Sequence, residues 1–365
     1  MGSALVFRGR AAASLAAVGC LLGALCSCSN DHSPTAPTLS PRSYFMGFSG
    51  FPPRPSVATI LQTIDAWSPR ADAALILGEP PWDSLLAGRS PDSLIRNDQL
   101  GLANYYRAKG LRVIVSVDPT NGLDRSSDSA PLVAAGRSLA EPAIQQVFRS
   151  YVTAMDTLIH PDYLTVASET NLIRAIASPT LYSAVVQAAN GAATDVRTVD
   201  PNARLVTTVQ VEVAWGRLVS GGAYVGIAQD RADFPFVQAL GLSSYPYLGG
   251  WVDPDSLPLD YYSRLTEGSP IPMMVIEGGW SSDSVGTAAW TPEIQRRYIR
   301  RHAQILDRAG AAGWFQITYT DLDVAALGFP PGTLDAFAHL GLVDENFVAK
   351  PARAEWDATF ARPRH

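Results

Sequence analysis

Two short apolar segments of the sequence each end in a glutamate. The first reads Tyr-Leu-Thr-Val-Ala-Ser-Glu over residues 163–169, and the second reads Met-Met-Val-Ile-Glu over residues 273–277. Short runs of apolar and β-branched residues that stop at a polar side chain are typical of buried strands. We therefore expect two strands to carry Glu169 and Glu277 at their ends, where the two carboxylates meet in one pocket.

A pair of carboxylates in one pocket can cleave a glycosidic bond. If the two groups lie about 5 Å apart, one can attack the anomeric carbon while the other protonates the leaving oxygen, and a wider gap leaves room for direct attack by water. The carboxyl group that donates the proton must stay protonated near neutral pH. Burial and the negative charge of its neighbour would raise its pKa enough to allow this.

Other reactive side chains are scarce in the sequence. Lys109 and Lys350 fall in an expected helix and in the C-terminal tail, so Schiff-base chemistry is not expected. No histidine lies at the end of an expected strand, which argues against a histidine-bound metal and against a Ser-His-Asp relay. All three cysteines fall within residues 1–28. We therefore expect no metal and no cofactor, and carboxylates and aromatic rings remain as the chemistry of the site.

Eight short apolar segments alternate with amphipathic segments along the chain. This alternation predicts an α/β fold, a single (β/α)₈ TIM barrel, whose active site lies at the carboxyl ends of the strands. No glycine-rich fingerprint follows the first segment, which argues against a dinucleotide-binding fold. The expected strands are Tyr44–Phe48, Ala74–Leu77, Arg112–Val117, Tyr163–Ala167, Arg204–Val211, Val237–Leu242, Met273–Ile276 and Trp314–Thr318. The expected helices include Ser56–Trp67, Pro91–Lys109, Pro142–Ile159, Pro179–Val199 and Thr291–Ala309, and the connection Ala214–Asp233 is the least regular.

Alternation along a strand determines which side chains can face the inside of the barrel. If Glu277 points inward, then Val275 does so too, and Ile276 and Met274 point outward. The same alternation allows further inward acids at the ends of other strands, namely Glu79, Asp118 and Glu212.

Aromatic residues gather in the loops that follow the expected strands. Aromatic rings can pack against the apolar faces of sugars, while carboxylates and amides bind sugar hydroxyls. A carboxylate pocket lined with tryptophan is therefore what a carbohydrate site requires, although the same rings could instead cap the top of the barrel. These residues are Trp82, Trp215, Tyr245, Tyr247, Trp251, Trp280, Trp290 and Tyr319.

Three of the residues named above stand in motifs that resemble a known group of enzymes. They are Glu169 in Ser-Glu-Thr-Asn, Tyr245 in Gly-Leu-Ser-Ser-Tyr-Pro-Tyr and Glu277 in Val-Ile-Glu-Gly-Gly-Trp. These motifs and their order resemble the clan of retaining β-glycosidases with catalytic glutamates on strands four and seven, glycoside hydrolase clan A. Within the clan, the pattern looks most like the arabinogalactan endo-β-1,4-galactanases of glycoside hydrolase family 53, which have similar Gly-Leu-Ser-Tyr-Tyr-Pro and Asn-Glu-Ile-Asn motifs.

The resemblance implies a role for each matched residue. Glu169 would be the acid/base and Glu277 the nucleophile, while the Tyr245 hydroxyl would position the nucleophile. Two departures from the clan affect the substrate site: Ser168 stands where asparagine is usual, and Tyr319 lies where the eighth strand usually carries a tryptophan. Asn171 would match the second asparagine of the acid motif. The full set of expected substrate-binding residues is Ser168, Asn171, Trp82, Asp118, Glu212, Trp215, Tyr247, Trp251, Trp280 and Tyr319.

The N-terminal residues predict export. Residues 1–28 carry Arg8 and Arg10, followed by an apolar run that ends in Leu-Cys-Ser-Cys, and this pattern resembles a bacterial lipoprotein signal peptide. Cys28 is the expected lipidated residue, which would attach the mature protein to the cell envelope. A plain secretory signal is the alternative, and Cys20 and Cys26 are weaker candidates for lipidation.

The rest of the chain divides into two parts. Residues 29–42, rich in Ser, Thr and Pro, are expected to form a disordered tether, and residues 43–360 are expected to form one catalytic barrel. Loss of the signal with its two arginines takes the formal charge from −6 to −8, and no basic run argues for a nucleic-acid partner. We expect a monomer that contacts a membrane only through its lipid and takes a polysaccharide or oligosaccharide as substrate.

Three hypotheses remain open at this point. The first is a retaining glycoside hydrolase that cleaves β-glycosidic bonds, with a galactan-like substrate favoured. The second is a decayed barrel that only binds carbohydrate, suggested by Ser168 and the altered eighth strand. The third takes Asp118, Glu169 and Glu212 as oxygen ligands of Mg²⁺, but such barrels need a lysine or histidine base, and none is placed to serve.

Overall fold

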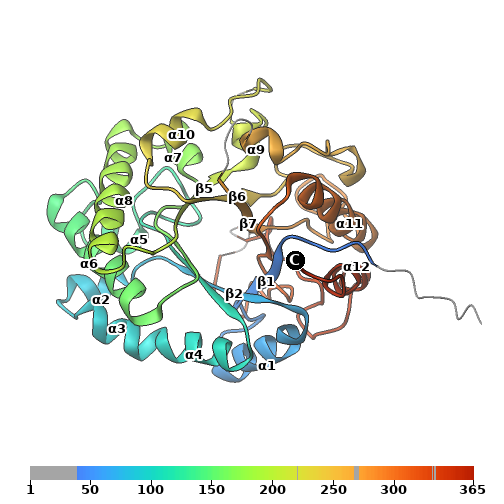
Figure 1. The fold of residues 1–365 in the computed structure, drawn as a ribbon, viewed down its shortest axis with the longest axis horizontal. Helices are drawn as coiled ribbons and strands as arrows, with labels where there is room; N and C mark the ends of the chain where they lie inside the picture. The colour runs from blue at the N-terminus through green and yellow to red at the C-terminus, as the bar shows by residue number, and fades with distance from the viewer. Residues whose placement is uncertain (1–38, 220, 267–270, 331, 333) are drawn as a thin grey trace, which may run out of the picture. The chain divides into compact units, whose positions relative to one another are not determined.

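Eight parallel strands form one closed barrel in sequence order (Figure 1). The computed structural model describes residues 39–365 except 220, 267–270, 331 and 333. The predicted signal peptide, with Cys20, Cys26 and Cys28, lies outside the described residues. The strands are β1 (Phe45–Ser49), β2 (Ala73–Gly78), β3 (Arg112–Val117), β4 (Tyr163–Thr165), β5 (Leu205–Gln210), β6 (Ala239–Ser244), β7 (Met273–Gly278) and β8 (Gly313–Gln316).

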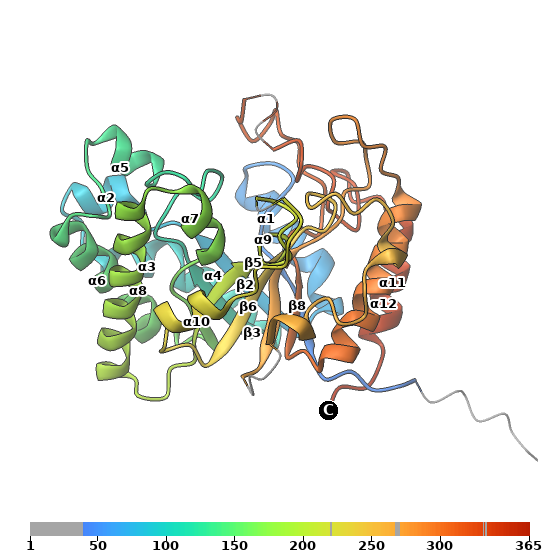
Figure 2. The same ribbon diagram turned by 90° about the horizontal axis from the view of Figure 1, so that it is seen from above.

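Helices surround the barrel, and the strands run between them (Figure 2). The predicted (β/α)₈ arrangement is confirmed over the described residues. The helices are α1 (Val57–Trp67), α2 (Trp82–Leu86), α3 (Pro91–Asp98), α4 (Leu100–Ala108), α5 (Ala130–Ala134), α6 (Pro142–Ile159), α7 (Thr170–Ile176), α8 (Pro179–Val199), α9 (Val211–Ala214), α10 (Ala228–Asp233), α11 (Pro292–Ala309) and α12 (Pro351–Phe360).

Side-chain caps fix the starts of three long helices close to the predicted positions. Ser56, Ser178 and Thr291 each accept a hydrogen bond from a backbone N–H in the first turn of α1, α8 and α11. Gly310 ends α11 in the left-handed conformation that glycine adopts at little cost. The predicted helix Pro91–Lys109 is instead two helices, because the chain breaks at Gln99 after Asn-Asp, two residues that favour helix ends over helix interiors.

The inside of the barrel is filled by one apolar cluster, which shows that the predicted facing of the seventh strand is wrong. Met274 and Ile276 belong to this inner cluster, whereas Val275 packs in the outer core between strands and helices. The register explains the difference: Leu242 pairs with Val275, but the next residue, Ser243, pairs with Glu277. The extra residue in β7 is a β-bulge, and it turns Glu277 toward the barrel opening.

The two ends of the described chain pair beside the barrel. Arg42 forms a parallel bridge with Arg364, and its backbone N–H donates to the carbonyl of Pro363 at 2.8 Å. Arg42 is buried and ion-paired with Asp72, so the folded unit includes a residue that the sequence places in the tether.

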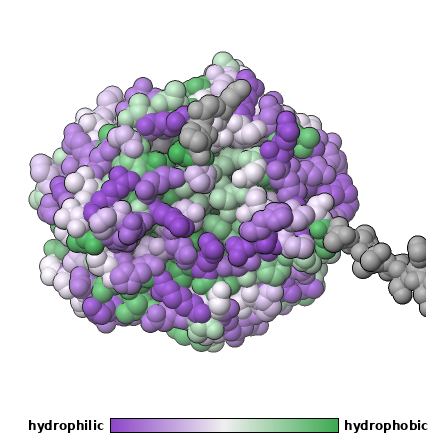
Figure 3. Space-filling model, viewed as in Figure 1, coloured by the Kyte–Doolittle hydropathy of each residue, from purple (hydrophilic) through white to green (hydrophobic). Residues whose placement is uncertain are grey.

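Hydrophilic side chains are spread over the periphery of the face seen in Figure 3. Among the described residues, no helix has the length and apolar character needed to cross a bilayer.

The tight inner packing of the barrel predicts a strong effect of Gly47→Ala. A Cβ at this position would collide with the carbonyl oxygen of Ala73 and lie 2.6 Å from a ring carbon of Phe315. We expect a loss of about 1–3 kcal/mol in the free energy of unfolding, measured by denaturant titration. Gly101→Ala on α4, where the added carbon meets no atom within 4 Å, is the matched control and should be neutral or slightly stabilising. Equal effects of the two substitutions would contradict the packing.

Candidate active site

Glu169 lies just beyond β4 and caps the N-terminus of α7 in an unusual backbone conformation. Its φ of 46° lies in the left-handed region, which costs a non-glycine residue roughly 1–2 kcal/mol. The backbone N–H of Glu169 donates to the Thr208 hydroxyl at 2.7 Å, and the side chain is almost buried. Strained residues of this kind are held only where the surroundings fix them, and they are concentrated at functional sites.

Helix α7 is fixed to the neighbouring part of the barrel by two sets of polar contacts. Thr170 donates to Asp230 at 2.9 Å, and Arg174 forms an ion pair with the same carboxylate at 2.7 Å. The Asn171 amide donates to the carbonyl of Gln210 and accepts from its N–H, both at 2.8 Å. Asn171 was predicted to bind substrate, but both ends of its amide are used on backbone and the residue is only 1% exposed. Asn171 therefore fixes the first turn of α7 to the end of β5.

Glu277 reaches the barrel opening through the bulge in β7. The Tyr245 hydroxyl donates to Glu277 Oε1 at 2.8 Å, which is the contact that the resemblance implies for these two residues. Tyr245 itself is buried, and the ring of Phe337 packs edge-on against it at 5.1 Å between centroids. The Glu277 side chain therefore has a defined position even without substrate.

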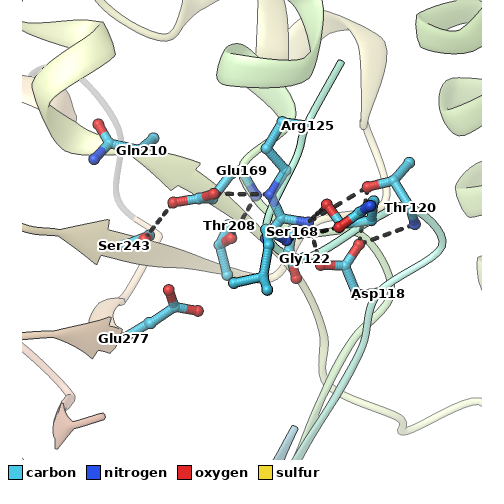
Figure 4. Close-up of polar contacts among 12 residues, drawn as sticks. Asp118, Thr120, Gly122, Arg125, Ser168, Glu169, Thr208, Gln210, Ser243 and Glu277 are labelled. Carbon is cyan, nitrogen blue, oxygen red and sulfur yellow. Dashed lines mark hydrogen bonds and ion pairs between the residues drawn. The ribbon is translucent and has the colours of Figure 1, made fainter. Parts of the chain in front are cut away.

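Ser243 connects the two glutamates. It is the β6 partner of Glu277 in the strand register, and its hydroxyl donates to Glu169 Oε1 at 2.6 Å. Neighbouring strands lie about 4.8 Å apart, so Ser243 lies directly beside Glu277 while its hydroxyl contacts the Glu169 carboxylate. Figure 4 shows both carboxyl groups directed toward the same space from opposite sides. The structure thus brings together the two acids that the sequence singles out.

Arg125 is a site residue that the sequence analysis missed. Its Nε donates to Glu169 Oε2 at 2.8 Å, and its guanidinium also forms an ion pair with Asp118, as Figure 4 shows. All three side chains are buried. Arg125 lies in the irregular loop after β3, where no periodicity indicates the direction of a side chain. The only available signal was a single arginine close in sequence to a strand-end acid, Asp118.

The charges around Glu277 set its protonation. The pKa of Glu277 is raised to about 7, mainly by burial and next by the negative charge of Glu169, while Arg125 and the Tyr245 hydrogen bond lower it. The effect of Glu169 on this pKa follows from the short separation of the two carboxylates at the barrel opening. Glu277 is therefore protonated below about pH 7 and ionised above it.

Glu212, which was predicted to bind substrate, lies fully inside the fold and is engaged by other residues. It is 0% exposed, and its two carboxylate oxygens accept hydrogen bonds from Gln210, Ser244, Tyr261 and the Tyr245 backbone. Asp118 is equally committed, since it pairs with Arg125 and accepts from the N–H of Thr120 at 3.0 Å. The three acids of the magnesium hypothesis therefore do not converge, and no group of three potential ligands occurs among the described residues.

Most of the predicted sugar-binding aromatics are packed in the core. Trp82 and Trp280 are 1% and 0% exposed, and Tyr247 is buried between Trp280 and Trp290. Tyr319, expected to replace the missing tryptophan of the eighth strand, packs against Phe48 instead. For these residues the alternative interpretation, that they cap the barrel, fits the burial better.

Two of the aromatics keep part of their surface exposed. The Trp215 ring stacks on Tyr261 and the Arg264 guanidinium lies over it, whereas the Arg217 guanidinium lies 3.9 Å from the centre of the Trp251 ring. Ser168, at the position of the usual asparagine, is buried and lies 3.5 Å from the hydroxyl of Ser116. Its side chain therefore has a partner inside the barrel.

Comparison with known proteins shows the fold. No protein-family model and no curated protein sequence matches the chain. An exo-β-1,4-mannosidase from Opitutaceae bacterium strain TAV5 is similar in structure, with a TM-score of 0.63 and 17% identity, over 89% of this chain and 60% of that chain. The GH5_18 protein from Streptomyces cattleya, solved with GlcNAc, has a TM-score of 0.61 and 16% identity over 88% and 81%. An uncultured Clostridium sp. β-glucuronidase has a TM-score of 0.55 and 14% identity over 87% and 50%.

These similarities establish the architecture of the chain and do not by themselves establish its activity. The chain spans about 60% of the mannosidase and half of the glucuronidase. At such low identity, a shared (β/α)₈ barrel can support many different reactions.

The buried ion pairs of Arg125 predict a large loss of stability in Arg125→Met. The substitution leaves the carboxylates of Asp118 and Glu169 buried without a cation, and we expect it to cost about 3–5 kcal/mol of unfolding free energy at pH 7. Arg54→Met removes the partner of Asp323 from a pair whose side chains are 42% and 30% exposed, and should cost less than about 1 kcal/mol. Denaturant unfolding measures both variants. A similar cost for the two would mean that the buried triad does not form.

The raised pKa of Glu277 predicts that Glu277→Gln stabilises the fold in alkaline buffer. The folded state holds the proton of Glu277 up to about pH 7, whereas the unfolded chain releases it near 4.5, so the wild type loses stability between these values. Glutamine can still accept from Tyr245 and has no charge to bury. We expect it to add up to about 3 kcal/mol at pH 8 and little at pH 4.5, by thermal and denaturant unfolding.

Glu293→Gln is the control for this experiment. Glu293 lies exposed on α11, and hydrogen bonding to Arg296 lowers its pKa, so its substitution should not stabilise the protein at pH 8. An advantage of Glu277→Gln that stays constant from pH 4.5 to 8 would contradict the raised pKa.

Proposed function

We propose that this protein is a glycoside hydrolase that cleaves β-glycosidic bonds with retention of configuration, with Glu277 as nucleophile and Glu169 as acid/base. The observation that carries the proposal is the pair of carboxylates from β4 and β7 that face one space at the barrel opening, each held by a hydroxyl donor. Support also comes from the comparison structures, since those named are glycosidases or a GH5_18 protein with the same barrel. Active sites of such barrels lie at the carboxyl ends of the strands.

The reaction would take place in two displacements. In the first, a Glu277 oxygen bonds to the anomeric carbon while the bond from that carbon to the leaving oxygen breaks, and Glu169 gives its proton to that oxygen. In the second, Glu169 takes a proton from water, the water oxygen bonds to the anomeric carbon, and the bond to Glu277 breaks. The first displacement requires a proton on Glu169, so the ion pair that its carboxylate forms with Arg125 in this structure must be replaced in the reactive complex.

The charge state of Glu277 makes the proposal specific about pH. The nucleophile must be ionised, and burial with the nearby Glu169 raises the pKa of Glu277 to about 7. Activity limited by this group therefore rises through neutral pH. The Tyr245 hydroxyl lowers the pKa of Glu277, because its hydrogen bond stabilises the ionised carboxylate.

The finer parts of the proposal rest on sequence motifs. A galactan-like substrate is favoured by the resemblance of the Glu169, Tyr245 and Glu277 motifs to family 53. Trp215 and Trp251 remain the candidates for sugar stacking, since both keep exposed surface. We also propose a monomer that is exported and anchored through Cys28, with secretion as the alternative, from residues 1–42 alone.

The roles of the two glutamates predict different defects. Glu277→Ala should lower kcat/KM by at least roughly 1,000-fold on every substrate, because no covalent intermediate can form. The Glu169→Ala variant should still carry out the first step, attack of Glu277 on the substrate, when the leaving group is an activated phenol, which needs no proton. In the second step azide should replace the missing base-activated water and give a glycosyl azide. The measurement is aryl-glycoside and polysaccharide turnover over galactan, mannan, xylan and glucans. Wild-type kcat/KM should show an acid limb near pH 7.

Glu293→Ala, on the exposed face of α11, serves as the activity control and should match the wild type. Sugar release that survives Glu277→Ala would refute the assignment. If the acid limb of the kcat/KM profile lies far below pH 7, Glu277 is not the group that must be ionised for activity.

One observation favours a second candidate function, a barrel that binds carbohydrate without cleaving it. Both oxygens of Glu169 are already engaged, one by Ser243 and one by Arg125, and Ser168 replaces the usual asparagine. A permanent Arg125 contact would leave no proton donor. Calorimetric binding to a polysaccharide, together with the absence of turnover on activated aryl glycosides, would select this function over the first.

A further inference from the structure

We propose that Glu212, which touches neither the candidate reacting groups nor solvent, is the positioning residue that holds both Glu169 and Glu277 in place. The residue lies in the first turn of α9, directly after β5, and is completely buried. The catalytic readout of this inference rests on the proposed function, and its structural readout does not.

Glu212 is connected to Glu277 through Tyr245. Glu212 Oε2 accepts the backbone N–H of Tyr245 at 3.1 Å, and the hydroxyl at the far end of the same tyrosine donates to Glu277 at 2.8 Å. The carboxylate therefore fixes the backbone from which the ring of Tyr245 extends to the barrel opening. A shift of this backbone would move the hydroxyl away from Glu277.

Glu212 is connected to the Glu169 segment through Gln210. Gln210 Nε2 donates to Glu212 Oε2 at 2.6 Å, and its Oε1 accepts from the Val213 N–H at 2.9 Å, which fixes the orientation of the amide. The backbone of Gln210 is clamped in both directions by Asn171, two residues beyond Glu169. One buried carboxylate thus bonds both Tyr245, which contacts Glu277, and Gln210, which contacts the segment that carries Glu169.

A chain of hydrogen bonds supplies the other oxygen of Glu212. Tyr261 donates to Glu212 Oε1 at 2.8 Å, and Ser244 donates to it at 3.1 Å while accepting from Tyr262 at 3.0 Å. His302 Nε2 lies 2.9 Å from the Tyr262 hydroxyl, and burial lowers the pKa of His302 to about 3. Since the Tyr262 proton goes to Ser244, the neutral His302 must donate through Nε2, and every donor in the chain is directed toward Glu212.

The directions of these donors decide what each substitution at Glu212 should do. Glutamine can present its carbonyl oxygen to Gln210 and Tyr245, which can only donate, and its NH₂ to the hydroxyls of Ser244 and Tyr261, which can rotate to accept. Glu212→Gln should therefore keep Tyr245 in place. Glu212→Ala removes the acceptor and leaves a void, and Glu212→Asp shortens the side chain by one carbon so that it reaches the Tyr245 N–H poorly.

The test is the pKa of Glu277, measured by NMR titration of protein with ¹³C-labelled glutamate carboxyls, in which Glu277→Gln identifies the signal. The charged or titratable groups that act on Glu277 are Glu169, Arg125, Asp118 and Tyr245, and none is altered by the substitutions at 212. Because the Tyr245 hydroxyl lowers this pKa, Glu212→Ala should raise it by on the order of half to one pH unit. Tyr245→Phe should raise it by the same amount, and the double variant no further.

The control and the fallback variants make the outcome decisive. Glu212→Gln should leave the pKa of Glu277 near the wild-type value. If residue 212 served only to fill space, Glu212→Ala and Glu212→Asp would have no reason to raise this pKa. If Glu212→Ala does not fold, Glu212→Asp carries the test and should give a smaller rise. The inference would be overturned by a Glu277 pKa at the wild-type value in a folded Glu212→Ala or Glu212→Asp variant. Shifts of this pKa that add to those of Tyr245→Phe would overturn it too.

Activity provides a second readout with a substrate that the wild type turns over. Glu212→Ala should lower kcat by roughly 10-fold or more and change KM by less than about 3-fold, while Glu212→Gln restores most of kcat. If the wild type cleaves no glycoside, the proposed function fails, but the titration of Glu277 still decides the role of Glu212.

Discussion

The structure of this site depends on compensating several carboxylates that are buried at one barrel opening. A buried carboxylate needs donors or a cation, because transfer from water is costly. Asp118 and Glu169 share Arg125, while Glu212 has only neutral donors. Glu277 has the least compensation, with one tyrosine hydroxyl, and burial together with the charge of Glu169 raises its pKa to about 7. The distribution of donors therefore distinguishes the two central glutamates: Glu169 is paired with a cation, and Glu277 has a pKa near neutral pH.

Two departures from regular backbone aim these glutamates. Regular alternation in β7 would turn Glu277 away from the barrel, since Met274 and Ile276 fill the inside, and the bulge reverses this. Glu169 adopts a left-handed conformation where the short segment after β4 enters helix α7. Both features are costly or irregular in isolation, so the contacts behind them must hold them in place, which is what the Thr208, Asn171 and Glu212 hydrogen bonds supply.

The fold and the two central acids could be predicted from the sequence because both depend on local patterns. Strand periodicity located all eight strands, and a strand that ends in glutamate indicates where that glutamate lies. The facing of Ile276 could not be predicted, since a bulge is a property of two paired strands. Arg125 was missed for a similar reason: a loop without periodicity does not reveal which distant carboxylate its side chain meets. Asn171 was assigned to substrate because its motif matched, although the structure uses its amide on Gln210.

The aromatic residues show why residue type alone overstates a binding site. Loop tryptophans suit sugar stacking, but they are also the largest apolar groups with which a barrel can close its outer core. Here Trp280, Tyr298, His302, Trp314 and Trp356 make successive ring contacts between the helices and strands. Burial on this scale stabilises the ends of β6 and β7, where Tyr245 and Glu277 lie. The aromatics then contribute to the site by fixing its frame, and the candidates for sugar contacts are the half-buried rings, such as Trp215 and Trp251.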